Sequence, residues 1–407
     1  MNNRLNIGLF GFGCVGSGLY EVLNKSNLLN ASINKIVVKD PTKKRSLPPQ
    51  SFSYNKFDIL HDPEINLVVE LIDDAEAAYD IVTTAMKNGK HVISANKKLI
   101  AEHLEELIEL KERNKVSFLY EAAVCGSIPI IRNLEEYYNN DSLDSIEGIC
   151  NGTTNYILSR LDKEGLSFEE ILKDAQEVGF AETDPTLDID GFDSKFKLQI
   201  LVLHAFGLIT KPEDILNLGI RNIKTEDVQL AKEKGYRIKL ISSAERIDGK
   251  VRAFVAPQFV KADSFGYSVE NEFNAVSTKG LFADRQLFTG KGAGSYPTAS
   301  AVLSDVSALQ FSYNYEYRKL EQNNLSFQDD YTIRLFVSAN KVEELDLVEF
   351  LSIEEEFVSA DYSYRLGEVK LSQLTHEFYR GNPGLFISFF GEGLRKGRSN
   401  KVLKATA

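Results

Sequence analysis

Acidic and basic side chains are concentrated in one segment, residues 179–197, with the sequence GFAETDPTLDIDGFDSKFK. Its charged residues are Glu182, Asp184, Asp188, Asp190, Asp193, Lys195 and Lys197. Asp193 and Lys197 are four residues apart, so on a helix they would lie on one face within contact distance. The run that follows, LQILVLHAF, is apolar enough to form a buried helix. Charges at the entrance to a buried helix predict a functional site rather than a solvated loop.

A glycine-rich loop near the N-terminus predicts dinucleotide binding. The sequence GFGCVG at residues 11–16 follows an apolar run, 5–10, and precedes a helical pattern at 15–28. Such glycines allow a tight turn, a close approach of the backbone to a pyrophosphate, and packing of the helix on the strand. The alternative is a purely structural turn. The residues predicted to bind the cofactor here are Gly11, Phe12, Gly13, Cys14, Val15 and Gly16.

The end of the second predicted strand, near residue 38, bears on the choice between NAD and NADP. Asp40 could accept a hydrogen bond from a ribose hydroxyl, whereas Lys39 and the basic run 43–45 could neutralise a 2′-phosphate. We expect NADP, with NAD possible; the alternative is a solvated basic loop.

Two further segments follow predicted strands, where ligands bind in open α/β sheets. Lys97, in SANKKL, could hold a carbonyl oxygen or the nicotinamide amide, unless it is an ordinary lysine of an exposed helical turn. Glu121, in EAAVCGSIP, could bind a hard cation together with backbone carbonyls, unless the segment is only a buried turn.

The elements that must position these residues alternate in type. Short strands and helices alternate through residue 120, which predicts an α/β fold with a Rossmann-type doubly wound sheet. We expect this NAD(P)-binding domain at residues 1–135, completed by about 291–322. An α+β substrate-binding and dimerisation domain is expected at 136–290, and a small α+β unit at 328–407, after a polar linker at 323–330.

Length and composition limit the function. With 407 residues, two or three domains are expected. The net charge of −12 disfavours nucleic acid or an anionic membrane as partner. No apolar run approaches the ~20 residues of a membrane helix, and no secretory signal is evident. Three widely spaced cysteines give neither a disulfide framework nor a zinc pattern, and a cytoplasmic location fits best.

Three segments together resemble homoserine dehydrogenases: GICNGTTNYIL at 148–158, the acidic segment ending at Lys197, and GAGSYPTASA at 292–301. The likeness covers roughly residues 4 to 310. It implies a stand-alone, homodimeric or larger enzyme that reduces L-aspartate 4-semialdehyde to L-homoserine with NAD(P)H, on the route to threonine, methionine and isoleucine. The C-terminal unit resembles an ACT regulatory module, but it lacks the usual Pro-Gly turn after the first strand, so an effector role and a purely structural one are both open.

The resemblance also implies roles for individual residues. Lys197 would donate the proton, Asp193 would position it, and Lys97 would lie beside nicotinamide and substrate. Glu182 would bind the substrate ammonium, and Asp188 would shape the pocket. The remaining implied residues are Lys39 at the 2′-phosphate, Gly292 at the nicotinamide, and Glu121 with the carbonyls of Val124, Gly126 and Ile128 around a monovalent cation such as Na⁺. The sequence departs from the family at Asp73-Asp74, where a Gly-Gly pair is common.

Two other functions remain open at this point. One is another amino-acid or oxo-acid dehydrogenase with the same two-domain plan. The other is a non-catalytic nucleotide sensor, which the presence of Lys97, Asp193 and Lys197 disfavours.

Overall fold

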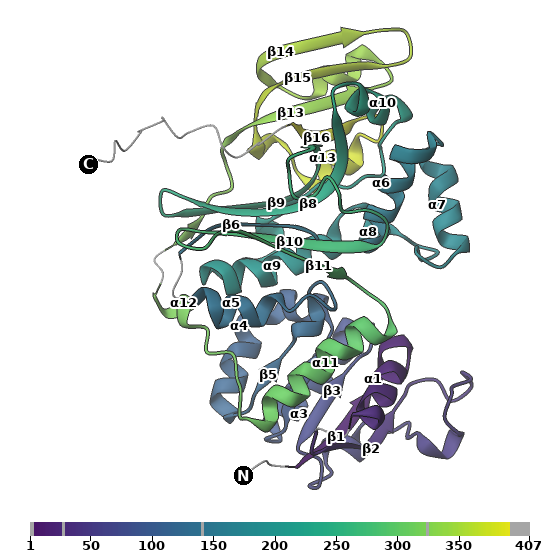
Figure 1. Ribbon diagram of the computed structural model, residues 1–407, viewed down its shortest axis with the longest axis vertical. Coiled ribbons are helices and arrows are strands. Elements are labelled where there is room, and N and C mark those ends of the chain that lie inside the picture. The colour runs from purple at the N-terminus through teal and green to yellow at the C-terminus, as the bar shows by residue number, and fades with distance from the viewer. Residues whose placement is uncertain (1–3, 27–28, 140–141, 323–324, 391–407) are drawn as a thin grey trace.

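The computed structural model describes residues 4–26, 29–139, 142–322 and 325–390. Two sheets follow one another along the long axis, with the N-terminal strands at one end and the last strands at the other (Figure 1). Among the described helices, none is long and apolar enough to cross a membrane.

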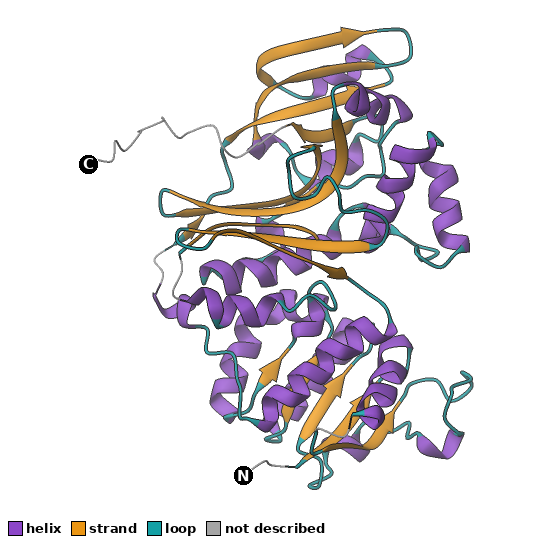
Figure 2. Cartoon of the chain, in the orientation of Figure 1, coloured by secondary structure: helices purple, strands orange, loops and turns teal. Residues whose placement is uncertain are grey.

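The N-terminal sheet is parallel and has the order β2-β1-β3-β4-β5. Its strands are β1 (Leu5–Phe10), β2 (Ala31–Val37), β3 (Leu67–Glu70), β4 (His91–Ser94) and β5 (Phe118–Leu119). The helices of this region are α1 (Cys14–Lys25), α2 (Phe57–Leu60), α3 (Ala75–Lys87) and α4 (Lys97–Asn114). Helices lie on both faces of the sheet (Figure 2), so β1, β3, β4 and β5 are almost wholly buried, whereas the edge strand β2 is partly exposed. The predicted doubly wound Rossmann-type fold is confirmed.

The strand order places a ligand crevice at a defined point. It reverses between β1 and β3, and ligands of doubly wound sheets bind outside the carboxyl ends of the strands at such a reversal. The glycine loop follows β1, Lys97 follows β4, and Glu121 follows β5. The topology therefore brings these predicted site residues to one edge of the sheet.

Helix α11 (Ser295–Gln310) returns to the N-terminal region and packs beside α1 (Figure 1). The Ser295 hydroxyl donates to the Cys14 carbonyl at 2.8 Å, and the Tyr296 hydroxyl donates to Glu21 at 2.5 Å. A Cβ on Gly18 would lie 2.4 Å from Ser295 Oγ, so glycine permits this contact. The contact agrees with the expectation that 291–322 completes this domain, although the exact boundaries stay predictions.

The first strand of the second sheet along the chain is β6. The spatial order of the sheet is β11-β10-β6-β8-β9-β16-β13-β15-β14, with β7 and β12 paired to β9. Its strands are β6 (Leu143–Ile149), β7 (Leu216–Asn217), β8 (Tyr236–Ile247), β9 (Lys250–Lys261), β10 (Phe273–Gly280), β11 (Asp284–Lys291), β12 (Ser326–Phe327), β13 (Thr332–Ala339), β14 (Phe350–Val358), β15 (Ser363–Lys370) and β16 (Phe386–Phe390). The remaining α-helices are α5 (Ile130–Glu135), α6 (Gly152–Glu164), α7 (Phe168–Glu177), α8 (Thr186–Ile189), α9 (Phe192–Phe206), α10 (Thr225–Glu233), α12 (Arg318–Gln322) and α13 (His376–Gly381). The 3₁₀ turns are η1 (Pro49–Ser51), η2 (Glu121–Ala123), η3 (Tyr137–Asn139), η4 (Pro212–Asp214), η5 (Val342–Leu347) and η6 (Leu371–Gln373).

Helix α9 is the central helix of the molecule. It begins after Gly191 (φ +82°) and ends before Gly207 (φ +65°), two left-handed positions that favour glycine. From Asp193 to Phe206 every residue is buried, because the helix lies between the second sheet and helices α4 and α5. Its first two turns therefore carry charged side chains into the interior.

The C-terminal unit has the expected order of elements, with the 3₁₀ turn η5 in place of the first helix. Its sheet continues the second sheet, because β16 pairs in parallel with β9 at Phe389 and Gln258. Phe254, Leu335 and Phe389 share one buried apolar cluster across this junction. The resemblance to an ACT module stays a prediction. Residues 323–324 of the expected linker and 391–407 of the unit lie outside the described residues.

Candidate active site

Asp193 is the centre of a buried network of charges. Lys197 Nζ lies 2.6 Å from one carboxylate oxygen of Asp193, and Lys97 Nζ lies 2.9 Å from the other. Lys197 also donates to the backbone carbonyl of Cys150 at 2.7 Å. The side chains of Asp193 and Lys197 are only 6% and 11% exposed, whereas that of Lys97 is 40% exposed. The network thus has a buried side and a side open to a ligand.

The pKa values of this pair are set by two opposed effects. Burial disfavours the charge of Asp193, but the charges of Lys197 and Lys97 and a hydrogen bond from Asn151 lower its pKa below the ordinary value. Burial also disfavours the charge of Lys197, yet Asp193 beside it raises the lysine pKa above its ordinary value. Both groups are therefore ionised at neutral pH.

Asn151 joins Asp193 to Asp188. Its amide nitrogen donates to Asp188 Oδ1 at 2.6 Å and to Asp193 Oδ2 at 2.9 Å, while its carbonyl oxygen caps helix α6 by accepting from the Thr154 N–H. Burial, and then the charge of Asp193, raise the pKa of Asp188. The sequence did not single out Asn151 as a site residue. Its position in the segment GICNGTTNYIL, which carried the resemblance, was the available signal.

The other acidic residues of the segment lie outside this network. Glu182 is exposed on the loop between α7 and α8, and in the described structure no hydrogen bond or ion pair joins its carboxylate to the network. Asp184 accepts from the Thr186 N–H at 3.1 Å. Asp190 pairs with Arg221 at 2.8 Å. The role predicted for Glu182 stays a prediction, and Asp184 and Asp190 are structural.

The glycine loop has the geometry that a pyrophosphate requires. Gly11 has φ +90°, and a Cβ there would lie 2.4 Å from the Leu71 carbonyl oxygen; a Cβ on Gly16 would lie 2.3 Å from the Gly11 carbonyl oxygen. Gly13, in contrast, faces open space. Among the described residues no side chain caps the N-terminus of α1, whose first amides also have no partner within the helix. These amides fit the phosphates of a dinucleotide.

The residues at the adenosine end lie close together on the surface. The side chain of Lys39 is 96% exposed and its Nζ lies 4.0 Å from Asp74. Asp40 accepts hydrogen bonds from the backbone and hydroxyl of Thr42, which lower its pKa. Asp74 caps helix α3 through the Ala77 N–H, which gives the unusual Asp73-Asp74 pair a structural use. Lys39 is free to turn toward a ligand.

The Glu121 side chain is held by hydrogen bonds from the backbone at the start of α5. Its two carboxylate oxygens accept the N–H groups of Ile131 and Arg132, each at 2.9 Å, at the start of α5. Burial, and then the neighbouring carboxylate of Asp305, raise the pKa of Glu121 to about 8. In the described part of the chain there is no group of three or more His, Cys, Asp or Glu side chains that could hold a metal. The Glu121 carboxylate thus already accepts two N–H groups, and its predicted role at a cation stays a prediction.

The loop that follows Glu121 touches the loop that carries Gly292. The Ser127 N–H donates to the Lys291 carbonyl at 3.1 Å, and a Cβ on Gly126 would lie 2.6 Å from the Gly292 carbonyl oxygen. Cys125 and Gly126 are both left-handed, with φ +54° and +51°. The Gly126 loop and the Gly292 loop are therefore in contact, and the Ile128 carbonyl accepts the Ile130 N–H at 2.8 Å. The roles predicted for Val124, Gly126, Ile128 and Gly292 stay predictions.

The sequence matches known proteins both in the N-terminal nucleotide-binding region and in the region that follows it. The family model for homoserine dehydrogenase matches residues 129–307, and that for the homoserine dehydrogenase NAD-binding domain matches residues 11–121. The homoserine dehydrogenase of Bacillus subtilis (strain 168) is 38% identical over 314 residues, 75% of this chain and 72% of the relative. That of Helicobacter pylori is 37% identical over 355 residues, 84% of each chain.

Solved structures give the same result. A homoserine dehydrogenase from Thiobacillus denitrificans superposes with a TM-score of 0.81 at 31% identity, covering 95% of this chain and 98% of that one. A structure from S. aureus has a TM-score of 0.73 at 30% identity, covering 96% and 100%. A glycine loop, a buried lysine–aspartate pair and these matches lead to one conclusion: the chain belongs to the homoserine dehydrogenase family, NAD(P)-dependent oxidoreductases that act on a CH–OH group.

Proposed function

We propose that this protein reduces L-aspartate 4-semialdehyde to L-homoserine and that Lys197 donates the proton to the forming alcohol oxygen. The observation that carries the proposal is the placement of Asp193 between Lys197 and Lys97, at 2.6 and 2.9 Å. The nicotinamide cofactor, when bound, supplies the hydride that the aldehyde carbon accepts. Lys197 gives its proton to the aldehyde oxygen, becomes neutral, and regains a proton from solvent.

The hydrogen bonds of Lys197 leave one position for the substrate. An ammonium group has three N–H donors. In the described structure two of them are used, by Asp193 and by the Cys150 carbonyl. The third can point at the aldehyde oxygen, and the raised pKa of Lys197 keeps the proton available at neutral pH.

The remaining polar groups match the other charges of the substrate. Lys97 is the more exposed lysine of the network, so it can meet the substrate oxygen or carboxylate beside the nicotinamide. Asp188 lies across Asn151 from Asp193 and can help to bind the ammonium group. Glu182 would complete that ammonium site if its loop moves toward Asp188.

The preferred cofactor in this proposal is NADP. Lys39 is the exposed cation at the expected 2′-phosphate position, and Asp40 is engaged by Thr42 rather than free for a ribose hydroxyl. The ratio of kcat/KM for NADPH and NADH tests this preference. Lys39→Ala should lower it, and an unchanged ratio would remove Lys39 from the site.

A monovalent cation is proposed at the carbonyls of Val124 and Gly126, together with those of Glu121 and Ile128. The consecutive left-handed residues Cys125 and Gly126 turn this stretch of backbone sharply, which favours convergent carbonyls. Replacing Na⁺ and K⁺ by choline at constant ionic strength should lower turnover. Equal rates in all three salts would contradict the cation site.

A homodimer is proposed through the edge strand β11 and the turn before it. Leu281 and Phe282 are neighbours at that turn and are 64% and 78% exposed, so a partner chain that covers them would remove apolar surface from water. Sedimentation of the protein measures the assembly, and a monomer at micromolar concentration would overturn this assignment.

Replacement of Lys197 tests the proposed function. Lys197→Met should lower kcat by about a thousandfold, because it removes the proton donor while keeping the length of the side chain. The affinity for NADPH, measured by fluorescence titration, should stay close to that of the unmodified protein. Lys173→Met, at an exposed position on α7, is the matched control. A parallel loss of cofactor affinity would make Lys197 a binding residue instead.

A further inference from the structure

Two buried cysteines meet beside the catalytic network. Cys125 follows the turn η2, Cys150 follows β6, and the two are 0% and 1% exposed. The Cys150 thiol donates a hydrogen bond to the Cys125 sulfur. Lys197 donates to the Cys150 carbonyl at 2.7 Å, and its charge acts on both thiols. The two cysteines are thus a pair of nucleophiles that the proposed reaction does not use.

The register of the second sheet explains how the two segments come together. Asn274 continues the antiparallel pairing of β10 with β6, so it lies opposite Cys150, and its side chain lies against the Cys125 thiol. A Cβ on Gly292 would lie 2.0 Å from the Asn274 side chain, and a Cβ on Gly126 would lie 2.6 Å from the Gly292 carbonyl oxygen. Close contacts therefore lead from the end of β6 to the loop that carries Cys125.

The hydrogen bond between the two thiols makes them chemically unequal. It lowers the pKa of Cys125; burial opposes this effect, but the charge of Lys197 adds to it. The same hydrogen bond, and then burial, raise the pKa of Cys150. Because the thiolate is the reactive form of cysteine, Cys125 is the first nucleophile of the pair and Cys150 is the thiol that reacts after it.

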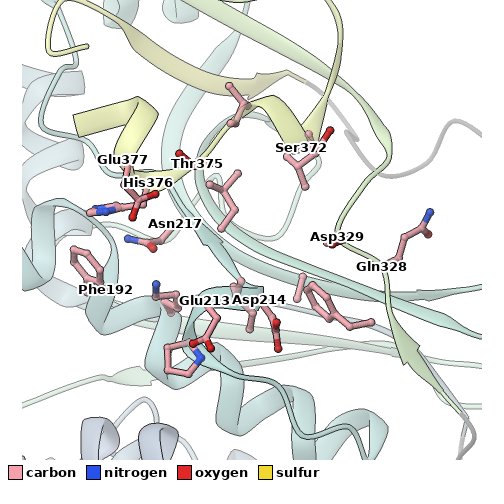
Figure 3. Close-up of a pocket in the computed structure, with 18 residues that line it drawn as sticks. Phe192, Glu213, Asp214, Asn217, Gln328, Asp329, Ser372, Thr375, His376 and Glu377 are labelled. Carbon is pink, nitrogen blue, oxygen red and sulfur yellow. The ribbon is translucent and has the colours of Figure 1, made fainter. Parts of the chain in front are cut away.

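A small oxidant can reach the pair from the cofactor crevice. The Lys97 side chain is 40% exposed there, and Lys197, which shares the Asp193 carboxylate with it and adjoins the thiols, is 11% exposed. Hydrogen peroxide is smaller than the aldehyde that reaches Lys197 in the proposed reaction. The cavity of about 550 Å³ between α9 and the C-terminal unit is a separate space, because neither cysteine is among the residues that line it (Figure 3).

We infer that Cys125 and Cys150 are a modification site, at which a hydroperoxide forms a reversible disulfide that stops turnover. The Cys125 thiolate attacks one peroxide oxygen, the O–O bond breaks, and the other oxygen leaves as hydroxide, which becomes water with the proton that Cys125 released. Cys150 then attacks the sulfur of the resulting sulfenic acid, and its hydroxyl leaves as a second water with the Cys150 proton. In total the two thiols lose two electrons and two protons, and the peroxide is reduced to two waters.

The disulfide acts on the catalytic network through the backbone. It brings the two sulfurs to about 2.05 Å, which shifts the backbone at one or both cysteines. The Cys150 carbonyl is one of the two described acceptors of Lys197, and the next residue, Asn151, donates to Asp193 at 2.9 Å. A displacement of about 1 Å at a reacting group can lower a rate about a hundredfold. The loss of turnover rests on the proposed role of Lys197, whereas the formation of the disulfide does not.

Peroxide treatment of the full chain tests the inference. All proteins in the test carry Cys14→Ser, so that Cys125 and Cys150 are the two of the three cysteines that remain. After treatment with hydrogen peroxide and alkylation of the free thiols, peptide mass spectrometry should find Cys125 joined to Cys150. The kcat of aldehyde reduction should fall by about a hundredfold relative to the same protein before treatment. Dithiothreitol should remove the cross-link and restore kcat.

A serine in place of either cysteine is the matched control. Cys125→Ser, in the same background, should form no cross-link within the chain, and its kcat should be the same before and after treatment. Each rate is compared with that of the same variant before treatment, so an effect of the substitution on the untreated rate does not enter. Cys150→Ser keeps the backbone carbonyl that Lys197 uses, and it decides the test if Cys125→Ser does not fold.

Three results would overturn the inference. The first is that the peptides of Cys125 and Cys150 stay separate in the treated protein. The second is that they are joined while kcat is unchanged. The third is that Cys125→Ser loses kcat to the same extent and recovers it with dithiothreitol. If the untreated protein does not reduce the aldehyde, the proposed function fails, and mass spectrometry still decides whether the disulfide forms.

Discussion

Two buried clusters of charge in this molecule behave in opposite ways. In one, Asp193 lies between Lys197 and Lys97. In the other, Glu121 and Asp305 share the single cation Arg132, which pairs with Asp305 at 3.0 Å. All three carboxylates are buried to a similar degree, with exposures of 5%, 2% and 0%.

Their pKa values nevertheless move apart. Asp193 has its pKa lowered by its two lysines despite burial, whereas burial raises the pKa of Glu121 to about 8 and that of Asp305 to about 7. Burial alone therefore does not decide whether a carboxylate is ionised; the number of cations per carboxylate does. The first cluster holds charges ready for proton transfer. The second holds protonated or shared carboxyl groups that join β5, α5 and α11.

Removing the shared carboxylate of the first cluster should have the largest effect. Asp193→Asn leaves two lysines facing each other without their anion. We expect kcat to fall by about a thousandfold, because Lys197 loses both its position and its raised pKa. We also expect a loss of about 3–5 kcal/mol in the free energy of unfolding, since a buried charge loses its partner. Asp184→Asn, at an exposed carboxylate of the same segment, is the control; equal kcat values in the two variants would refute the assignment.

Removing the exposed cation of the same cluster should have an intermediate effect. Lys97→Met should lower kcat/KM by about a hundredfold, as loss of one charged group at the reacting oxygen typically does. The free energy of unfolding, measured in urea, should change little, because the Lys97 side chain is 40% exposed. The neighbouring Lys98→Met, which loses only a surface contact to Glu102, should keep both values. If kcat/KM fell equally in Lys98→Met and Lys97→Met, the contact of Lys97 with Asp193 would not explain the loss of activity.

The second cluster should show a smaller effect, in stability rather than turnover. Glu121 and Asp305 have raised pKa values in the folded state, so their contribution to stability is full below their ordinary pKa values, 4.5 and 3.8, and is lost as pH rises toward about 8 and about 7. Asp193 has a lowered pKa, so above pH ~3.8, the ordinary pKa of an aspartate, it does not change the dependence of stability on pH. Asp305→Asn removes one titrating group and the repulsion on Glu121. Unfolding measured from ~pH 5 to ~8 should show a shallower fall in stability in this variant than in the unmodified chain; parallel curves would contradict the raised pKa values.

The difference between the clusters also shows what the sequence could reveal. Asp193 and Lys197 are one helical turn apart, and the glycines at 11, 13 and 16 are local to one turn, so their spacing was sufficient to predict both groups. The alternation of strands and helices likewise predicted the Rossmann-type sheet, which the structure confirms.

Contacts between distant segments were not predictable in this way. Asp305 reaches Glu121 from 184 residues away, and Asn151 reaches Asp193 from 42 away. The cavity lined by Lys195, Asn217 and His376 is likewise formed by segments far apart in the sequence that only the fold brings together. The hydrogen bonds from the Ile131 and Arg132 N–H groups to the Glu121 carboxylate join segments ten and eleven residues apart, and they too were not predicted. The role of Glu182 remains a prediction.

The dependence of turnover on pH in both directions tests the proton donor most directly. Because the pKa of Lys197 is raised, the lysine stays protonated through the neutral range, so the rate of aldehyde reduction should be nearly flat between ~pH 6.5 and ~9. Homoserine oxidation needs neutral Lys197 as a base, and its kcat should rise by about tenfold per pH unit between ~7 and ~10. A flat profile for oxidation over that range would contradict Lys197 as the group that transfers the proton.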